Sequence, residues 1–96
     1  MIRDEIAEVL ALQPKFSARN TSEMQRRGKL IRDEIRARFE ANRTVLDEAF
    51  QRTYSGNLSF EGRDGTGSKT YIPWHRLYVD EFSPSAQIGW YVVLLF

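Results

Sequence analysis

The first twelve residues carry apolar side chains at the spacing of an amphipathic helix. These apolar positions are Ile2, Ile6, Val9, Leu10 and Leu12. Their separations of three and four predict a helix over residues 2–12 with one face turned toward a core. The helix is expected to end ahead of Gln13-Pro14, because a residue that precedes proline is disfavoured in the α conformation. A short loop over residues 15–20 follows.

A second, longer helical pattern begins after this loop. Its start carries two overlapping capping boxes, Asn20 with Glu23 and Ser22 with Gln25. In such a box the short polar side chain caps the helix and the later residue bonds back to the cap. The helix is predicted to run to about Ala41. Its apolar face contains Met24, Gly28, Ile31, Ile35 and Phe39.

A third helix is predicted over residues 44–52, directly before a break in the pattern. Its apolar positions are Val45, Leu46, Ala49 and Phe50. The next residues, Tyr54-Ser55-Gly56-Asn57, are typical of a turn and are expected to end the helical part.

The pattern changes to a period of two from Leu58 onward. Leu58 and Phe60 alternate with polar residues, residues 71–79 are rich in β-formers, and residues 88–96 form the most apolar run. These segments predict strands. Helices followed by strands are typical of an α+β fold, here with a mainly antiparallel sheet. Residues 80–87 are expected to connect the last two strands.

The whole chain is expected to form one partial domain, with a helical part over residues 1–53 and a β part over residues 54–96. Its final run, Gly89 to Phe96, has no turn or polar tail after it. A strand this hydrophobic normally has neighbours on both sides or a covered face. We therefore expect the polypeptide to continue beyond Phe96, with further elements that complete the sheet.

The glycine-rich stretch GRDGTGSK, residues 62–69, lies between the first two predicted strands. Its glycine spacing is that of a P-loop, which has the pattern G-x-x-x-x-G-K-[ST] and enters a helix. Here Ser68-Lys69 reverses the last two letters, and the β-branched and aromatic residues that follow are poor helix formers. The favoured interpretation is a hairpin connection in which Gly65 and Gly67 adopt positive φ.

Composition narrows the classes of function. The chain has 96 residues, no cysteine, one histidine and a net charge of +1. The absence of cysteine excludes disulfides, thiolate zinc sites and cysteine nucleophiles. A single histidine gives little support for a catalytic triad. No run is apolar enough to span a bilayer, so we expect a cytoplasmic protein without a membrane partner. Asp64, Asp80 and Glu81 carry oxygen ligands, but turn chemistry explains them, and we expect no metal and no cofactor.

Basic residues are concentrated on the second helix and just after it. Seven of the fourteen lysines and arginines lie between positions 26 and 43: Arg26, Arg27, Lys29, Arg32, Arg36, Arg38 and Arg43. Such a patch suits phosphate contacts, which release counterions from nucleic acid. Asp33, Glu34 and Glu40 are interleaved with it, so a solvated face laced with salt bridges is an equal alternative.

Aromatic residues gather in the β part beside several cations. The aromatics are Tyr71, Trp74, Tyr78, Phe82, Trp90, Tyr91 and Phe96, and the cations nearby in sequence are Arg63, Lys69 and Arg76. This combination suits stacking on a base that has left the duplex, although most aromatics of a small sheet belong to its core. His75 is predicted to be a strand residue with a satisfied hydrogen bond, since the sequence places no nucleophile or carboxylate beside it.

Three segments together resemble a known family: LALQPKFSARNTSEMQRRGKLIRDEI, GRDGTGSKTYIPWHRLY and SPSAQIGWYVVLLF. In order and spacing they are similar to the McrB-like N-terminal domain, which is found at the front of modification-dependent restriction proteins and related endonucleases. The resemblance covers nearly the whole chain and corresponds to roughly the first half of a typical family domain.

This resemblance implies a module that binds double-stranded DNA containing methylated or otherwise modified cytosine and turns the modified base into an aromatic-lined pocket. Residues at the matching positions are Trp74, Tyr91 and Leu95. The loop equivalent to residues 65–69 faces the DNA in this pattern. Thr66 stands where the best-understood member places an aromatic, which implies a wider pocket or a different modification. Full-length relatives carry a nuclease or a GTP-driven motor further on, in cis or in trans.

The expected DNA contacts are thus divided into two groups. Base contacts are assigned to Trp74, Tyr91, Leu95 and Thr66, and backbone contacts to Lys69, Arg63, Arg76, Arg27 and Arg36. The chain itself is not expected to be an enzyme. Two other interpretations remain open, namely a protein-interaction domain of a defence-related endonuclease and a piece of an enzyme whose catalytic residues lie further along.

Overall fold

The computed structural model describes residues 2–51, 58–87 and 91–96, and it has the expected α+β architecture. Helix α1 spans Ile2–Leu12 and is followed by a 3-10 turn, η1, at Gln13–Lys15. The predicted end of the first helix before Gln13-Pro14 is therefore confirmed. The predicted break at residues 54–57 lies outside the described residues.

One long helical rod follows and ends where the sequence predicts, at Ala41. It consists of α2 (Ser22–Lys29), a π-helical turn η2 (Leu30–Glu34) and α3 (Ile35–Ala41). After a turn at Asn42, α4 spans Arg43–Gln51, within a residue of its predicted bounds.

The start of this rod differs from both capping boxes. Thr21 is the N-cap, and its side-chain oxygen accepts a hydrogen bond from the backbone N–H of Met24 at 3.2 Å. The prediction of Asn20 or Ser22 as the cap was wrong by one residue. Adjacent Asn, Thr and Ser are all competent caps, and the choice falls on the residue whose backbone is extended, which is Thr21.

Three antiparallel strands form the sheet in the order β1-β2-β3. Strand β1 spans Leu58–Arg63, β2 spans Trp74–Val79 and β3 spans Val92–Leu95. Strand β2 begins later than the predicted residue 71, because Pro73 lacks the N–H that a paired strand position needs. The last strand is shorter than predicted, and residues 88–90 of its predicted range lie outside the described residues.

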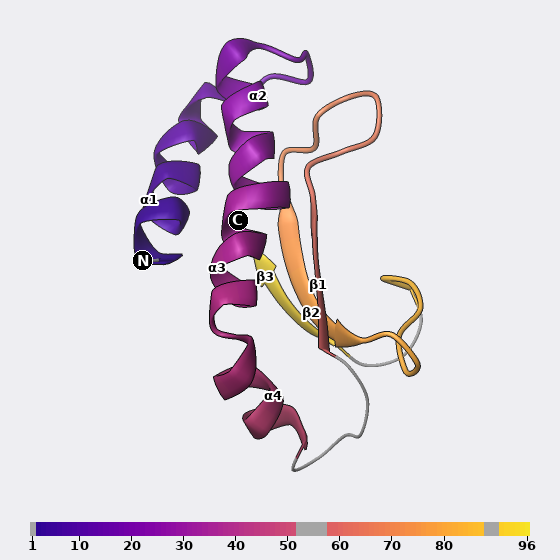
Figure 1. Cartoon of the computed structure of the whole chain (residues 1–96). Coiled ribbons are helices and arrows are strands. Elements are labelled where there is room, and N and C mark those ends of the chain that lie inside the picture. The colour runs from indigo at the N-terminus through magenta and orange to yellow at the C-terminus, as the bar shows by residue number, and fades with distance from the viewer. Residues whose placement is uncertain (1, 52–57, 88–90) are drawn as a thin grey trace.

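The helices cover one face of this sheet, so the fold has two layers (Figure 1). On the helical side Val9, Leu30, Ile31 and Ile35 form one buried cluster, and on the sheet side Leu58, Phe60, Leu77 and Val79 form another. Phe39 packs against both clusters and therefore joins the layers. In the described part of the chain, every helix is too short or too polar to cross a bilayer.

Candidate nucleic-acid interface

The two faces of the sheet carry different side chains, because successive strand residues point to opposite sides. Leu58, Phe60, His75, Leu77 and Val79 face the helices and are buried. Register aligns Arg63 with Trp74 and Trp74 with Leu95 on the other side. We call that side the open face, since none of the helices in the described part of the chain lies over it (Figure 1). Its residues are Ser59, Glu61, Arg63, Trp74, Arg76, Tyr78, Val93 and Leu95, together with Tyr91 just before β3.

The open face contains a hollow of about 350 Å³, within the range of ligand pockets. Its lining residues are Trp74, Ala86, Gln87, Tyr91, Val93 and Leu95. Trp74 and Tyr91 are half-buried, whereas Leu95 is 68% exposed. The structure thus brings Trp74, Tyr91 and Leu95, which the sequence assigned to one pocket, to the walls of one hollow.

Three of the lining residues, Ala86, Gln87 and Val93, were not predicted from the sequence. Val93 was within reach, since residues 91, 93 and 95 of an extended segment point to the same side. Ala86 and Gln87 belong to the connection that follows β2, and no periodic signal in the sequence places that connection over the sheet.

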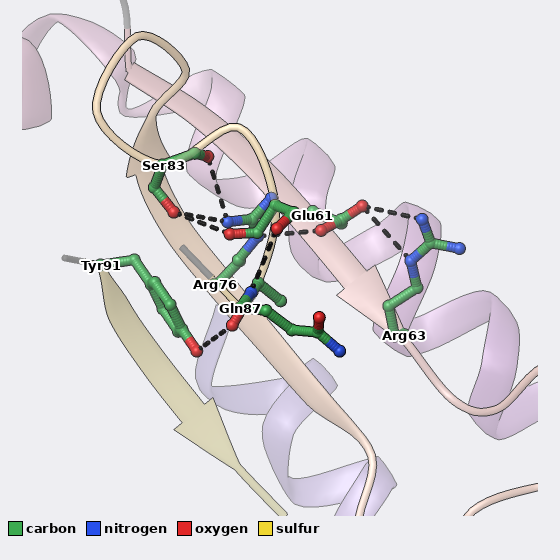
Figure 2. A network of polar contacts seen from close by, with 8 residues as sticks. Glu61, Arg63, Arg76, Ser83, Gln87 and Tyr91 are labelled. Carbon is green, nitrogen blue, oxygen red and sulfur yellow. Dashed lines mark hydrogen bonds and ion pairs between the residues drawn. The ribbon is translucent and has the colours of Figure 1, made fainter. Parts of the chain in front are cut away.

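A network of polar contacts lies beside this hollow and centres on Arg76 (Figure 2). Its Nε donates to Glu61 at 2.9 Å, and its Nη1 donates to the hydroxyl of Ser83 at 2.9 Å. The guanidinium carbon lies 3.6 Å from the ring centroid of Tyr78 and 5.5 Å from that of Tyr91. Arg76 is only 2% exposed. Its guanidinium is thus enclosed by protein, whereas the sequence assigned it to a contact with the DNA backbone.

Glu61 links this buried arginine to an exposed one. It accepts hydrogen bonds from Arg76 and, at 3.0 Å, from Arg63. Burial by itself raises the pKa of Glu61, but the hydrogen bonds from the two guanidinium groups outweigh burial and hold that pKa below its ordinary value. Arg63 stays 58% exposed along its side chain, so it remains available to a phosphate.

The loop between β1 and β2 is held by a buried carboxylate. Asp64 accepts hydrogen bonds from Arg32 at 2.7 Å and from Lys69 at 3.0 Å. Gly65 and Gly67 have φ values of 111° and 79°, which glycine tolerates. Since the loop enters a strand, it lacks the helix N-terminus of a P-loop, and the hairpin interpretation is confirmed.

Two predicted contacts lie in this loop and differ in access. Thr66 is exposed, within the loop that connects β1 to β2. Lys69 is different, since its side chain is 11% exposed and its ammonium is paired with the buried Asp64. Lys69 therefore secures the loop and does not present a free charge at the surface.

Arg27 lies inside the protein, whereas the sequence assigned it to a contact with a DNA phosphate. It is 0% exposed, and it donates to Gln13 Oε1 at 2.8 Å and to the carbonyl of Thr70 at 2.6 Å. Burial lowers the pKa of its guanidinium. Gln13 in turn donates to the carbonyl of Tyr71 at 3.0 Å, so both side chains tie the helical layer to the residues just before Trp74.

Most of the other basic residues of the rod, and Arg43 at the start of α4, are paired with acids. Arg26 binds Glu8 and Glu34, Arg38 binds Glu5 at 3.0 Å, and Arg43 binds Glu40 at 2.9 Å. For these residues the salt-bridged face is the correct interpretation. Arg36 is exposed and makes no ion pair with any residue in the described part of the chain.

His75 is a strand residue, as the sequence predicts, and one of its two ring nitrogens is hydrogen-bonded, while its buried Nε2 has no hydrogen-bond partner in the described part of the chain. It is 0% exposed, and its Nδ1 donates to the carbonyl of Ile31 at 3.0 Å. Burial is the main cause that lowers the pKa of its imidazole, which stacks on the ring of Phe39 with 5.2 Å between the ring centroids. Across residues 2–51, 58–87 and 91–96, no three acidic or histidine side chains gather as a metal site would require.

Comparison with known proteins identifies the family. A search of curated proteins and a search of solved structures found no match. A family model described as "MrcB-like, N-terminal domain" matches residues 9–96, which is nearly the entire chain and is the family that the three sequence segments resemble. The chain therefore belongs to the MrcB-like N-terminal domain family.

Proposed function

We propose that this chain is the DNA-recognition module of a modification-dependent restriction system, and that it takes a methylated cytosine, turned out of the duplex, into the hollow on the open face. Membership of the family supports the association with restriction. The observation that carries the proposal is that Trp74, Tyr91 and Leu95 line one hollow on a sheet face without a helical cover.

The chemistry of the walls fits a flat, methylated base. Trp74 and Tyr91 offer ring faces for stacking, which contributes about 1–3 kcal/mol per base in single-strand binders. Leu95 and Val93 offer apolar contact for a methyl group. Thr66, exposed in the loop that connects β1 to β2, is smaller than an aromatic residue and leaves more room for a bulkier modification.

Phosphate contacts would come from a smaller set of cations than the sequence indicated. Arg63 lies on the open face next to Trp74, and Arg36 is exposed on α3. Lys69, Arg76 and Arg27 act from within the protein by holding the loop, the hollow and the helical layer in place. Cleavage would then belong to a nuclease or motor domain, in cis or in trans, and the chain itself would be non-catalytic.

The proposal is tested with paired affinities for a duplex with 5-methylcytosine and the same duplex unmodified. Trp74→Ala should lower affinity for the methylated duplex by roughly tenfold to a hundredfold, since one stacking platform is lost. Affinity for the unmodified duplex rests on phosphate contacts and should change much less. Phe82→Ala removes an exposed aromatic outside the hollow and serves as the control. Circular dichroism checks that each variant is folded.

Three results would count against the proposal. If the parent chain binds both duplexes equally, it does not recognise the modification. If a folded Trp74→Ala variant keeps the preference, the hollow is not the base site. If neither duplex binds, the open face is better explained as a surface for a partner protein of the restriction system.

A catalytic role for the isolated chain has its own test. The purified chain should hydrolyse neither GTP nor DNA, because the loop of residues 64–73 is a hairpin connection and no nucleophile–base pair faces the hollow. Hydrolysis that disappears on substitution of one of its own residues would contradict the assignment as a recognition module.

A further inference from the structure

We infer that Gln87 is the residue that reads the hydrogen-bonding edge of the base in the hollow. The inference rests on the proposed function and adds a specificity-determining residue to it. A flipped base is recognised by stacking on its faces and by hydrogen bonds to its Watson–Crick edge. Trp74 and Tyr91 supply the faces, and the question is which side chain supplies the edge.

The polar groups on the lining leave one candidate. The hydroxyl of Tyr91 already donates to the carbonyl of Ala86 at 2.5 Å. Trp74 has a single N–H donor and no acceptor. Ala86, Val93 and Leu95 have no polar side-chain atom. Because the donor of Tyr91 is already used, Gln87 is the described lining residue whose side chain still offers both a donor and an acceptor, and it is exposed with its amide in no hydrogen bond of the described structure.

Gln87 is also held in place by its backbone. Its N–H donates to the hydroxyl of Ser85 at 3.3 Å, and the hydroxyl of Ser83 donates to the carbonyl of Ser85 at 3.1 Å. Ser83 is bound in turn by the buried guanidinium of Arg76. Figure 2 shows these contacts from Arg76 through Ser83 to Gln87, together with the hydrogen bond from the hydroxyl of Tyr91 to the carbonyl of Ala86. The connection that carries Gln87 is thus anchored to the sheet, which limits the ordering that a bound base would require.

The amide matches the edge of cytosine. Cytosine presents a donor, its 4-amino group, beside an acceptor, N3. The Oε1 of a glutamine accepts from the amino group while its Nε2 donates to N3, which gives two parallel hydrogen bonds. A bidentate pair of this kind contributes discrimination of about tenfold to a hundredfold between bases. The methyl group at C5 is not part of this edge, so the amide and the apolar walls read different features of the same base.

The experiment uses three duplexes that differ at one position: 5-methylcytosine, unmodified cytosine, and 5-methylpyrimidin-2-one, which keeps the methyl group but lacks the 4-amino group. The parent chain should bind the second and third more weakly than the first. Gln87→Leu should lower affinity for the 5-methylcytosine duplex by about tenfold and should no longer distinguish it from the 5-methylpyrimidin-2-one duplex. Gln25→Leu makes the same change at an exposed glutamine of α2 and should leave all three affinities unchanged.

The outcomes separate this inference from the proposed function. If Gln87→Leu still distinguishes the two methylated bases while Trp74→Ala loses the preference for methylated DNA, the base enters the hollow but Gln87 does not read it. An equal loss for all three duplexes would also overturn the inference, since the 5-methylpyrimidin-2-one base has no 4-amino group for Gln87 to bind. If the parent chain shows no preference for 5-methylcytosine, both the proposed function and the inference fail.

Discussion

The residues buried on the helix-facing side of the sheet are mostly apolar, whereas the open face buries a charged residue, Arg76. Leu58, Phe60 and Leu77 are at most 5% exposed and pack against other apolar groups. Arg76 is buried to a similar extent, but its neighbours are a carboxylate, a hydroxyl and two aromatic rings. Apolar contacts are non-directional, while hydrogen bonds fix geometry. We infer that the helix-facing side mainly stabilises the fold and that the polar contacts of the open face mainly fix the geometry of the hollow.

The largest effect should come from truncating the helix-facing side. Leu77→Ala removes a buried side chain and leaves a cavity, which should lower the free energy of unfolding by about 2–5 kcal/mol. Leu95→Ala makes the same change at an exposed position of the open face and should alter it by no more than about 0.5 kcal/mol. Urea denaturation measures both. Equal losses would mean that the two faces contribute to stability alike.

The second effect compares two arginines that share one carboxylate. Arg76→Met leaves Glu61 and Ser83 without their buried partner and should cost about 2–3 kcal/mol in unfolding free energy. Arg63→Met breaks an exposed pair with the same Glu61 and should cost less than about 1 kcal/mol. If Arg76→Met is as mild as Arg63→Met, the network does not stabilise the open face.

A third effect tests the helix-facing side through the buried imidazole of His75. Burial lowers the pKa of His75, so below about pH 6.5 the unfolded chain binds a proton that the folded chain does not. Stability should therefore fall as pH decreases from there toward the lowered pKa, with a slope approaching about 1.4 kcal/mol per pH unit. Chemical denaturation of the parent chain and of His75→Gln between pH 7.5 and 5 measures this, since the sequence has no other histidine. A histidine-dependent slope of the opposite sign would contradict a neutral, buried imidazole.

The smallest effect concerns the surface charges assigned to phosphate binding. Arg36→Ala should reduce the slope of log affinity against log salt by about 0.9 and weaken binding to methylated and unmodified duplexes alike. Arg38→Ala is the matched control on α3, because Arg38 is already paired with Glu5. A reduction for Arg38 as large as that for Arg36 would show that pairing does not decide which cations reach the DNA.

Local signals in the sequence predicted most of the fold. The end of α1 before Gln13-Pro14 and the positive φ of Gly65 and Gly67 follow from steric rules that act within a few residues. The alternation of Leu58 and Phe60 likewise identified the buried side of β1. Family membership was recognised because the three segments keep their order and spacing.

The buried arginines were beyond this kind of prediction. Arg27 lies in a run of basic residues that suggests a surface, yet its partner carbonyl belongs to Thr70, which is 43 residues away in the chain. Arg76 likewise depends on Glu61 across the sheet and on Ser83 in the next connection. Burial of a charged side chain is decided by partners that only the tertiary fold brings close. For that reason the sequence overestimated the number of free cations.

The π-helical turn η2 has a consequence for the angular alignment of the long helical rod. Met24 and Phe39 are 15 residues apart, and in an uninterrupted α-helix with 3.6 residues per turn they would drift about 60° out of line. In η2 the N–H of Ile35 bonds to Leu30, five residues back, so this turn holds more residues than an α-turn and takes up the drift. With regular α-winding over the same residues, this drift would turn Phe39 away from both clusters it joins. The rod thus needs its irregular turn in order to keep a straight line of buried side chains.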